Sequence, residues 1–234
     1  DFIHNGLRRL GRRLPWPLDL RGGGRRRLYF FPDGAGASLR DSPCVPVVFD
    51  LDFLRHPGAP AGRNRLYYGR YLPRTLNRAA RVVVISEAMR AELLGAFGVP
   101  PEKVAVVHPA VDHSIFRPDV PAEARSAVRA KYGLEGGFIY SLGVLESRKN
   151  FPRLIEAYAS LPEEILVEYA LVIGGPGGRA KEIAGTIRRR GLEDRVRLLG
   201  SVDEADRAPL CAEAAVFVMP SLDEGFGVRV LEAM

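Results

Sequence analysis

Short apolar runs, many of them rich in valine and isoleucine, recur along the chain and alternate with segments whose apolar positions repeat at helical spacing. A continuous apolar run of about four to six residues is typical of a strand that is buried on both faces, as in a parallel sheet. Seven such runs predict strands at residues 45–49, 82–85, 104–107, 138–142, 169–174, 196–199 and 216–219. The helical patterns lie at residues 63–81, 87–97, 122–132, 151–161, 180–190 and 204–212. This alternation predicts an α/β fold with doubly wound parallel sheets.

One stretch of the chain follows neither period. Residues 111–121 contain two prolines and no regular apolar spacing, so they separate one series of strands and helices from the next. We therefore predict two Rossmann-like lobes, residues 1–111 and 122–234, joined by a linker at residues 112–121. A ligand shared by such lobes is expected in a cleft at the carboxyl ends of their strands.

The charge of the chain is unevenly distributed. The 234 residues are 47% hydrophobic and 26% charged, which is an ordinary globular composition, and the formal net charge is +6. Residues 1–27 hold eight arginines against two aspartates, and the remainder balances at 26 basic and 26 acidic residues. Because the excess is local, we do not predict a nucleic-acid partner. The Arg-rich residues 8–27 are either a contact for an anionic membrane surface or a solvated segment.

The two cysteines and the lengths of the apolar runs bear on the cellular compartment of the protein. Cys44 and Cys211 have neither the spacing of metal ligands nor that of a disulfide framework, so we expect no metal site and a reducing compartment. No apolar run approaches the length of about 18 residues that a membrane span needs. The sequence predicts a cytoplasmic location, with the inner face of the membrane as a second possibility.

Two glutamates frame a glycine-containing loop near the end of the sequence. Glu224 follows the predicted strand at 216–219, and Glu232 lies eight residues later in a helical pattern that spans about 12 Å at 1.5 Å per residue. Gly225 and Gly227 lack a Cβ atom, so their amides can approach a ligand closely. The spacing is compatible with an elongated anionic ligand held at both ends and equally with a solvated acidic helix face.

Basic residues follow another strand of the same predicted lobe. Arg148 and Lys149 lie in the loop after the strand at 138–142, just before the next helical pattern. Cations at the start of a helix oppose its dipole, which favours a ligand-binding role over a purely structural one. An arginine fork and a lysine ammonium are both suited to phosphate oxygens, so the pair predicts a diphosphate contact.

Several motifs in one order carry a family resemblance. They are Gly143 with residues 146–150, the strand and loop at 171–177, Leu199 with Gly200, and residues 217–221, 224–227 and 232–234. Matching segments upstream lie at residues 50–54, 86–87 and 108–112. From residue 43 onward the chain resembles family 4 retaining glycosyltransferases of the GT-B fold, and is most similar to bacterial mannosyltransferase-like members.

The resemblance implies roles for individual residues. It implies that Arg148 and Lys149 hold the donor diphosphate, that Glu224 is the catalytic glutamate beside the donor sugar, and that Glu232 contacts the nucleotide ribose. Val202 matches the place where the base packs. The remaining donor-binding residues line the sugar and phosphates, and they are Gly143, Gly225, Phe226, Gly227 and Val228.

The resemblance also implies a reaction. A sugar would pass from a nucleotide donor, with GDP-mannose as the first expectation, to a hydroxyl of a sugar or lipid-linked acceptor with its anomeric configuration retained. No metal and no separate cofactor are required. The acceptor would belong to cell-surface polysaccharide or glycolipid synthesis.

The sequence departs from the family pattern in the first lobe. Phe49 and Asp50 stand where the family usually has His-Asp, and a phenyl ring cannot hydrogen-bond a sugar hydroxyl. Asp50 and Asp52 are therefore the candidate acceptor-side residues. A second departure is Arg229, which stands where many members have proline. Phe49 also leaves open a non-catalytic protein of the same fold that binds a sugar nucleotide.

Two further expectations concern the ends of the chain and a rival class. The pattern begins and stops within lobes, so we expect both lobes to be incomplete and the 234 residues alone to be inactive.

Residues 175–180 fit a loose dinucleotide fingerprint, which would indicate an oxidoreductase. The acids Glu193 and Asp194 precede the following strand instead of ending it, which argues against that alternative.

Overall fold

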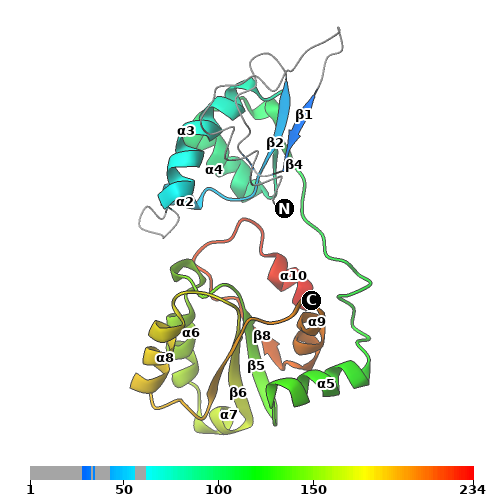
Figure 1. The fold of residues 1–234 in the computed structure, drawn as a ribbon, viewed down its shortest axis with the longest axis vertical. Helices are drawn as coiled ribbons and strands as arrows, with labels where there is room; N and C mark the ends of the chain where they lie inside the picture. The colour runs from blue at the N-terminus through cyan, green and yellow to red at the C-terminus, as the bar shows by residue number, and fades with distance from the viewer. Residues whose placement is uncertain (1–27, 33, 35–42, 56–61) are drawn as a thin grey trace. The chain divides into compact units, whose positions relative to one another are not determined.

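The computed structural model describes residues 28–32, 34, 43–55 and 62–234 (Figure 1). The Arg-rich residues 8–27, for which a membrane contact was predicted, lie outside the described residues. The chain divides into two compact units, Asp1–Pro109 and Ala110–Met234.

Unit 1 is built on a parallel four-stranded sheet in the order β1-β2-β3-β4. Its strands are β1 (Tyr29–Phe31), β2 (Cys44–Val48), β3 (Val82–Val84) and β4 (Val104–Val106). Its helices are α2 (Asp52–Arg55), α3 (Gly62–Arg78), α4 (Glu87–Phe97) and the short 3-10 helix η1 (Pro101–Lys103).

The core of unit 1 forms where these helices cover β2 and β3. Val82 and Val84 of β3 are fully buried, and so is Leu93 of α4. The start of α4 is fixed by Ser86, whose hydroxyl accepts a hydrogen bond from the Met89 amide at 3.1 Å. Parallel pairing places the carboxyl ends of these strands at one edge of the sheet, where residues 49–52 follow β2.

Unit 2 contains a second parallel sheet, in the order β7-β6-β5-β8. Its strands are β5 (Gly137–Leu142), β6 (Tyr169–Gly174), β7 (Val196–Gly200) and β8 (Val216–Phe217). Its helices are α5 (Ala122–Tyr132), α6 (Phe151–Ala159), α7 (Glu163–Glu168), α8 (Ala180–Arg189), α9 (Glu204–Glu213), α10 (Val228–Ala233) and the 3-10 helix η2 (Ser147–Lys149).

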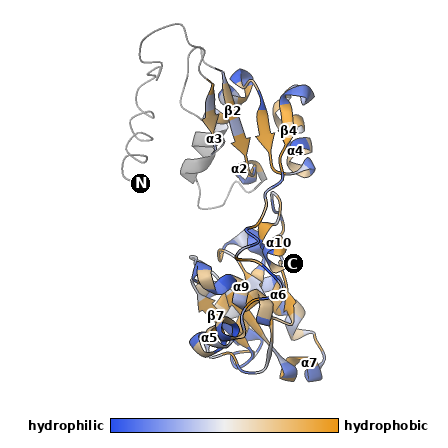
Figure 2. Cartoon of the chain, turned by 90° about the vertical axis from the view of Figure 1, so that its right-hand side faces the viewer, coloured by the Kyte–Doolittle hydropathy of each residue, from blue (hydrophilic) through white to orange (hydrophobic). Residues whose placement is uncertain are grey.

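Helices cover both faces of the second sheet. On one face, Ile155 of α6 and Ile183 of α8 pack with Leu171 of β6, and on the other, Val128 of α5 and Leu210 of α9 pack with strand residues. Figure 1 shows α6 and α8 on one side of β5 and β6, with α5 and α9 on the other. Figure 2 shows that the strands are the most hydrophobic elements, as sheets buried on both faces require.

Most predicted elements are confirmed to within two or three residues, and the differences have local causes. The helix predicted at 151–161 ends at Ala159, because the Ser160 hydroxyl bonds back to the Glu156 carbonyl at 2.9 Å and a proline follows at 162. The helical pattern that contains Glu232 forms α10, which begins at Val228 after Gly227 takes up a left-handed conformation with φ 86°. Three short elements, β1, α2 and α7, were missed.

None of the helices in the described parts of the chain is both long and apolar enough to cross a membrane. The longest, α3, has 17 residues and includes several arginines.

Gly175 allows the loops after β5 and β6 to meet backbone to backbone. Its φ is 140°, and a Cβ atom there would lie 1.8 Å from the Gly143 carbonyl oxygen. We predict that Gly175→Ala lowers the free energy of unfolding by about 2 kcal/mol or more, because the backbone must shift. The control is Gly178→Ala, where the added Cβ meets nothing within 4 Å. Thermal and urea denaturation would measure both variants, and equal stability of the two would contradict this account.

Candidate functional site

The loops after β5 and β8 lie side by side because these two strands pair directly. Backbone and side-chain hydrogen bonds tie the loops together. The Leu222 amide donates to the Arg148 carbonyl at 2.8 Å, and the Asn150 side-chain amide donates to the Pro220 carbonyl at 3.2 Å. Asn150 has φ 55°, which lets the chain turn from η2 directly into α6.

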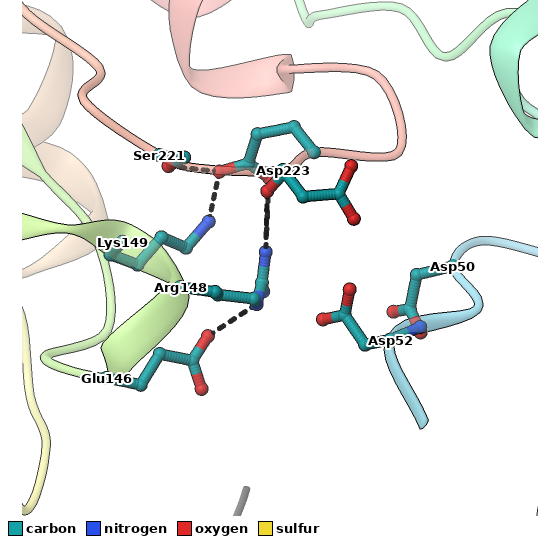
Figure 3. A network of polar contacts seen from close by, with 8 residues as sticks. Asp50, Asp52, Glu146, Arg148, Lys149, Ser221 and Asp223 are labelled. Atoms are coloured by element: carbon teal, nitrogen blue, oxygen red, sulfur yellow. Dashed lines mark hydrogen bonds and ion pairs between the residues drawn. The ribbon is translucent and has the colours of Figure 1, made fainter. Parts of the chain in front are cut away.

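Glu224 is the centre of a network that joins these two loops. One oxygen of its carboxylate accepts hydrogen bonds from Lys149 Nζ and, at 2.7 Å, from Ser221 Oγ. The other oxygen lies 3.4 Å from an Arg148 guanidinium nitrogen. Figure 3 shows Arg148 and Lys149 reaching from their loop toward the segment that carries Ser221 and Asp223. The predicted strand-end residues Arg148, Lys149 and Glu224 are thus brought together.

Two further contacts restrain the guanidinium group of Arg148. Its Nε lies 2.8 Å from a carboxylate oxygen of Glu146, and a terminal nitrogen donates to the Asp223 carbonyl at 3.4 Å. The side chains of Arg148, Lys149 and Glu224 are 25%, 13% and 21% exposed, so the network is largely shielded from water. Charges in such a position interact more strongly than charges on an open surface.

The charge state of Glu224 follows from these contacts. Burial by itself raises the pKa of Glu224, but hydrogen bonds from Lys149 and Ser221 and the positive charges of Lys149 and Arg148 act against it. The net result is a pKa below the usual range of a glutamate. Glu224 is therefore an anion at neutral pH and can accept hydrogen bonds from neutral donors such as sugar hydroxyls.

Glu232 forms a second polar pair further along the same segment. Its carboxylate accepts a 2.7 Å hydrogen bond from a terminal nitrogen of Arg229, one turn earlier in α10. The Glu232 side chain is only 11% exposed, so it is not the solvated acidic residue of the alternative interpretation. Its contact with a ribose stays a prediction.

The other predicted donor-binding residues lie around this loop and the neighbouring strand ends. Val202 follows β7, and its side chain occupies the space where Gly174 lacks a Cβ atom. A Cβ atom on Gly143 would meet its neighbours at 3.5 Å or more, so packing alone does not require glycine at this position. The segment from Glu224 to α10 contains the remaining predicted residues, Gly225, Phe226, Gly227 and Val228.

The candidate acceptor-side residues belong to unit 1. Asp50 is exposed just after β2, and Asp52 is the first residue of α2, with its amide 3.4 Å from an Asp50 carboxylate oxygen. Phe49 is 49% exposed at the same strand end. Their roles toward an acceptor stay predictions.

Metal binding was not expected from the sequence. Within the described ranges, no three histidine, cysteine, aspartate or glutamate side chains are grouped so that they would hold a metal ion. The cations next to Glu224 are Arg148 and Lys149, and both are paired with carboxylates.

Three contacts of the site were not predicted from the sequence. Ser221 supports Glu224, Glu146 supports Arg148, and Arg229 holds Glu232. Ser221 and Arg229 each lie three residues before the glutamate that they contact, and this spacing was the available signal for both.

Comparison with known proteins identifies the family of both units. Residues 125–234 match the model of the group 1 glycosyl transferases. Residues 28–115 match the model of Glycosyltransferase Family 4. The chain belongs to the family 4, group 1 glycosyltransferases.

A curated relative agrees with the assignment, and two solved structures share the fold. The chain is 34% identical over 170 residues to O-antigen chain mannosyltransferase B of Escherichia coli, an alignment covering 72% of this chain and 44% of that protein. The lipopolysaccharide glycosyltransferase WaaG superposes with a TM-score of 0.71 at 19% identity, covering 99% of this chain and 59% of WaaG. HepE from Anabaena, solved with UDP and glucose, gives 0.68 at 23%, covering 82% of this chain and 50% of HepE. The fold is therefore GT-B.

The chain spans less than half the length of the first curated relatives that it matches, 44% and 37% for two of them. Donor, acceptor and reaction course of the whole protein are accordingly proposals.

The ionisation of Glu224 makes the stability of this glycosyltransferase depend on pH. The folded-state pKa of Glu224 lies below the ordinary value of about 4.3. The ionised carboxylate therefore stabilises the folded state above that pH, and this stabilisation is lost as the pH falls through the folded-state pKa. We predict that the wild type is more stable than Glu224→Gln at pH 7 and that the difference shrinks at pH 3.

The control is Glu182→Gln, which removes a carboxylate from an exposed ion pair with Arg179. Such pairs contribute about 0.5 kcal/mol or less, so little change is expected at either pH. Urea denaturation measures these differences, and a Glu224→Gln difference of equal size at both pH values would refute the assignment.

Proposed function

We propose that this chain carries the donor site of a retaining glycosyltransferase that moves a hexose from a nucleoside diphosphate sugar to an acceptor hydroxyl. The observation that carries the proposal is the Glu224 carboxylate held between Lys149 and Arg148 at the carboxyl end of the sheet. A nucleotide sugar offers a diphosphate to the two cations and hydroxyls to the carboxylate.

The chemistry of sugar transfer suits these groups. When the bond between the sugar and the phosphate breaks, negative charge grows on the diphosphate and positive charge on the sugar ring. Fixed cations near the leaving group stabilise this charge in the transition state, because they need not reorganise as the reaction proceeds. Arg148 and Lys149 fill that role, and they exchange contacts with Glu224 for contacts with phosphate oxygens.

We assign Glu224 to the orientation of the donor sugar and not to covalent attack. Both of its oxygens already accept hydrogen bonds, which fixes the orientation of the carboxylate. A carboxylate has about four acceptor positions, so it can still accept hydrogen bonds from sugar hydroxyls. A covalent retaining mechanism of the hydrolase type needs two carboxyl groups about 5–5.5 Å apart around the reacting carbon. In the proposed reaction, the acceptor hydroxyl attacks the anomeric carbon on the face that the diphosphate leaves, the bond between the sugar and the phosphate breaks, and the hydroxyl proton passes to the departing phosphate oxygen.

A hexose donor with mannose as the first candidate is supported by the relatives. The E. coli protein is named an O-antigen chain mannosyltransferase, and HepE was solved with UDP and glucose. We propose GDP-mannose as the first donor to test and a growing polysaccharide or lipid-linked oligosaccharide as the acceptor. Such an acceptor would place the enzyme at the inner face of the membrane.

Phe49 favours a second candidate function, a non-catalytic protein that binds a sugar nucleotide. This phenyl ring is half-exposed at the carboxyl end of β2 and has no group that hydrogen-bonds a hydroxyl. Asp50 and Asp52 are the carboxylates nearby in sequence that would substitute for the missing contact.

The donor role of the two cations is testable by binding. We predict that the double variant Arg148→Gln, Lys149→Met lowers the affinity for GDP-mannose or UDP-glucose by about a hundredfold or more, because each charged hydrogen bond contributes about 1.5–3 kcal/mol. The matched control is Arg188→Gln, Lys181→Met, which removes one arginine and one lysine from the exposed face of α8. Calorimetry measures both, and unchanged affinity in the first variant would exclude the diphosphate role.

Turnover distinguishes the two candidate functions. The full-length protein is incubated with nucleotide sugars and an acceptor extract, and we expect release of nucleoside diphosphate and a product whose anomeric configuration by NMR equals that of the donor. An inverted product would refute the retaining mechanism. Donor binding without turnover, unchanged in Phe49→His, would establish the non-catalytic alternative.

A further inference from the structure

Arg148 lies between two carboxylates that come from different loops. Its Nε lies 2.8 Å from a carboxylate oxygen of Glu146, two residues earlier in the same loop. A terminal nitrogen lies 3.4 Å from Glu224 of the loop after β8. Figure 3 shows Glu146 and the segment of Ser221 and Asp223 on opposite sides of the Arg148 side chain. A well-formed contact between nitrogen and oxygen measures about 2.7–3.2 Å, so Glu146 is the closer partner of the guanidinium.

The two cations of the site thus have different principal partners. Arg148 is paired most closely with Glu146, whereas Lys149 is in direct contact with Glu224. Two carboxylates and two cations leave this group without net charge. An entering diphosphate reaches Lys149 only if Lys149 leaves Glu224. Arg148 differs, because its terminal nitrogens can bind phosphate oxygens while its Nε stays with Glu146.

The backbone that carries Glu146 is held independently of the loop after β8. Glu146 occupies the N-cap position of η2, yet its side chain makes no capping hydrogen bond there. The Leu145 amide donates to the Pro176 carbonyl at 2.7 Å, and the Lys149 amide donates to the Glu146 carbonyl at 3.1 Å. The pair of Glu146 and Arg148 therefore lies within one restrained loop. It does not require Glu224 to stay in place.

We propose that Glu146 is a positioning residue that keeps the Arg148 guanidinium directed at the donor diphosphate while Lys149 changes partners. The inference rests on the proposed donor site and adds a residue that supports it. Without Glu146, Arg148 is expected to close on Glu224, because opposite charges in a shielded place attract strongly. One carboxylate would then occupy both cations, and a diphosphate would have to displace it from both.

A competing role for Glu146 is electrostatic repulsion of the diphosphate. Its side chain is 40% exposed, so water and salt screen its charge and weaken any repulsion. The two roles predict opposite results. Repulsion predicts tighter anion binding when the charge of Glu146 is removed, whereas positioning predicts weaker binding when its contact with Arg148 is removed.

The experiment is a double-mutant cycle on nucleoside diphosphate affinity, measured by calorimetry with the full-length protein. GDP, UDP and ADP are tried with the wild type, and the best ligand is used for all variants. We expect Glu146→Ala to weaken binding about tenfold, as Arg148→Gln does, and Glu146→Gln, which keeps an acceptor for Nε, less than about threefold. Glu146→Ala is expected to cause no further loss in Arg148→Gln, but to multiply the loss in Lys149→Met.

The matched control is Glu156→Ala, which removes a 41% exposed carboxylate from an ion pair with Arg190. This variant is expected to keep the wild-type affinity.

The contradicting outcomes are separable. A merely structural role for Glu146 would multiply the losses with Arg148→Gln as well as with Lys149→Met, which would overturn the positioning role. Tighter binding in Glu146→Ala would also overturn it, and so would unchanged affinity in Glu146→Ala beside a loss in Arg148→Gln. These results leave the donor site intact. Failure of the wild type to bind any of the three nucleotides would overturn the proposed function and this inference with it.

Discussion

The ion pairs of Glu224 with Lys149 and Arg148 are the interaction on which the candidate site depends. They connect the loop after β5 to the loop after β8, and these loops are neighbours because the two strands pair in parallel. Opposite charges held together in a shielded place are stabilising only while each retains its partner. A ligand that enters must therefore offer both an anion for the cations and hydrogen-bond donors for the carboxylate.

The need for both an anion and hydrogen-bond donors restricts the class of ligand more than the cations or the carboxylate do separately. A free phosphate would satisfy Lys149 and Arg148 but would leave Glu224 facing a like charge. A neutral sugar would satisfy Glu224 but would leave the cations without an anion. A sugar diphosphate meets both conditions in one molecule.

Much of this arrangement was predictable because parallel sheets place strand ends at a common edge. The apolar runs located seven of the eight strands in the described part of the chain, and Glu224, Arg148 and Lys149 each followed one of them. Strand β1 and helices α2 and α7 were missed because three, four and six residues are too few to show a period. The contacts of Glu224 with Lys149 and Arg148 depend on how two loops meet at the sheet edge, which spacing along the chain does not determine.

The most direct test of the account is a crystal structure of the full-length protein with a bound nucleoside diphosphate sugar. The account predicts that the diphosphate contacts Arg148 and Lys149, that Lys149 has exchanged its bond to Glu224 for a phosphate oxygen, and that Glu224 accepts a hydrogen bond from the sugar. A nucleotide sugar bound elsewhere, with the Lys149 and Glu224 contact unchanged, would contradict it.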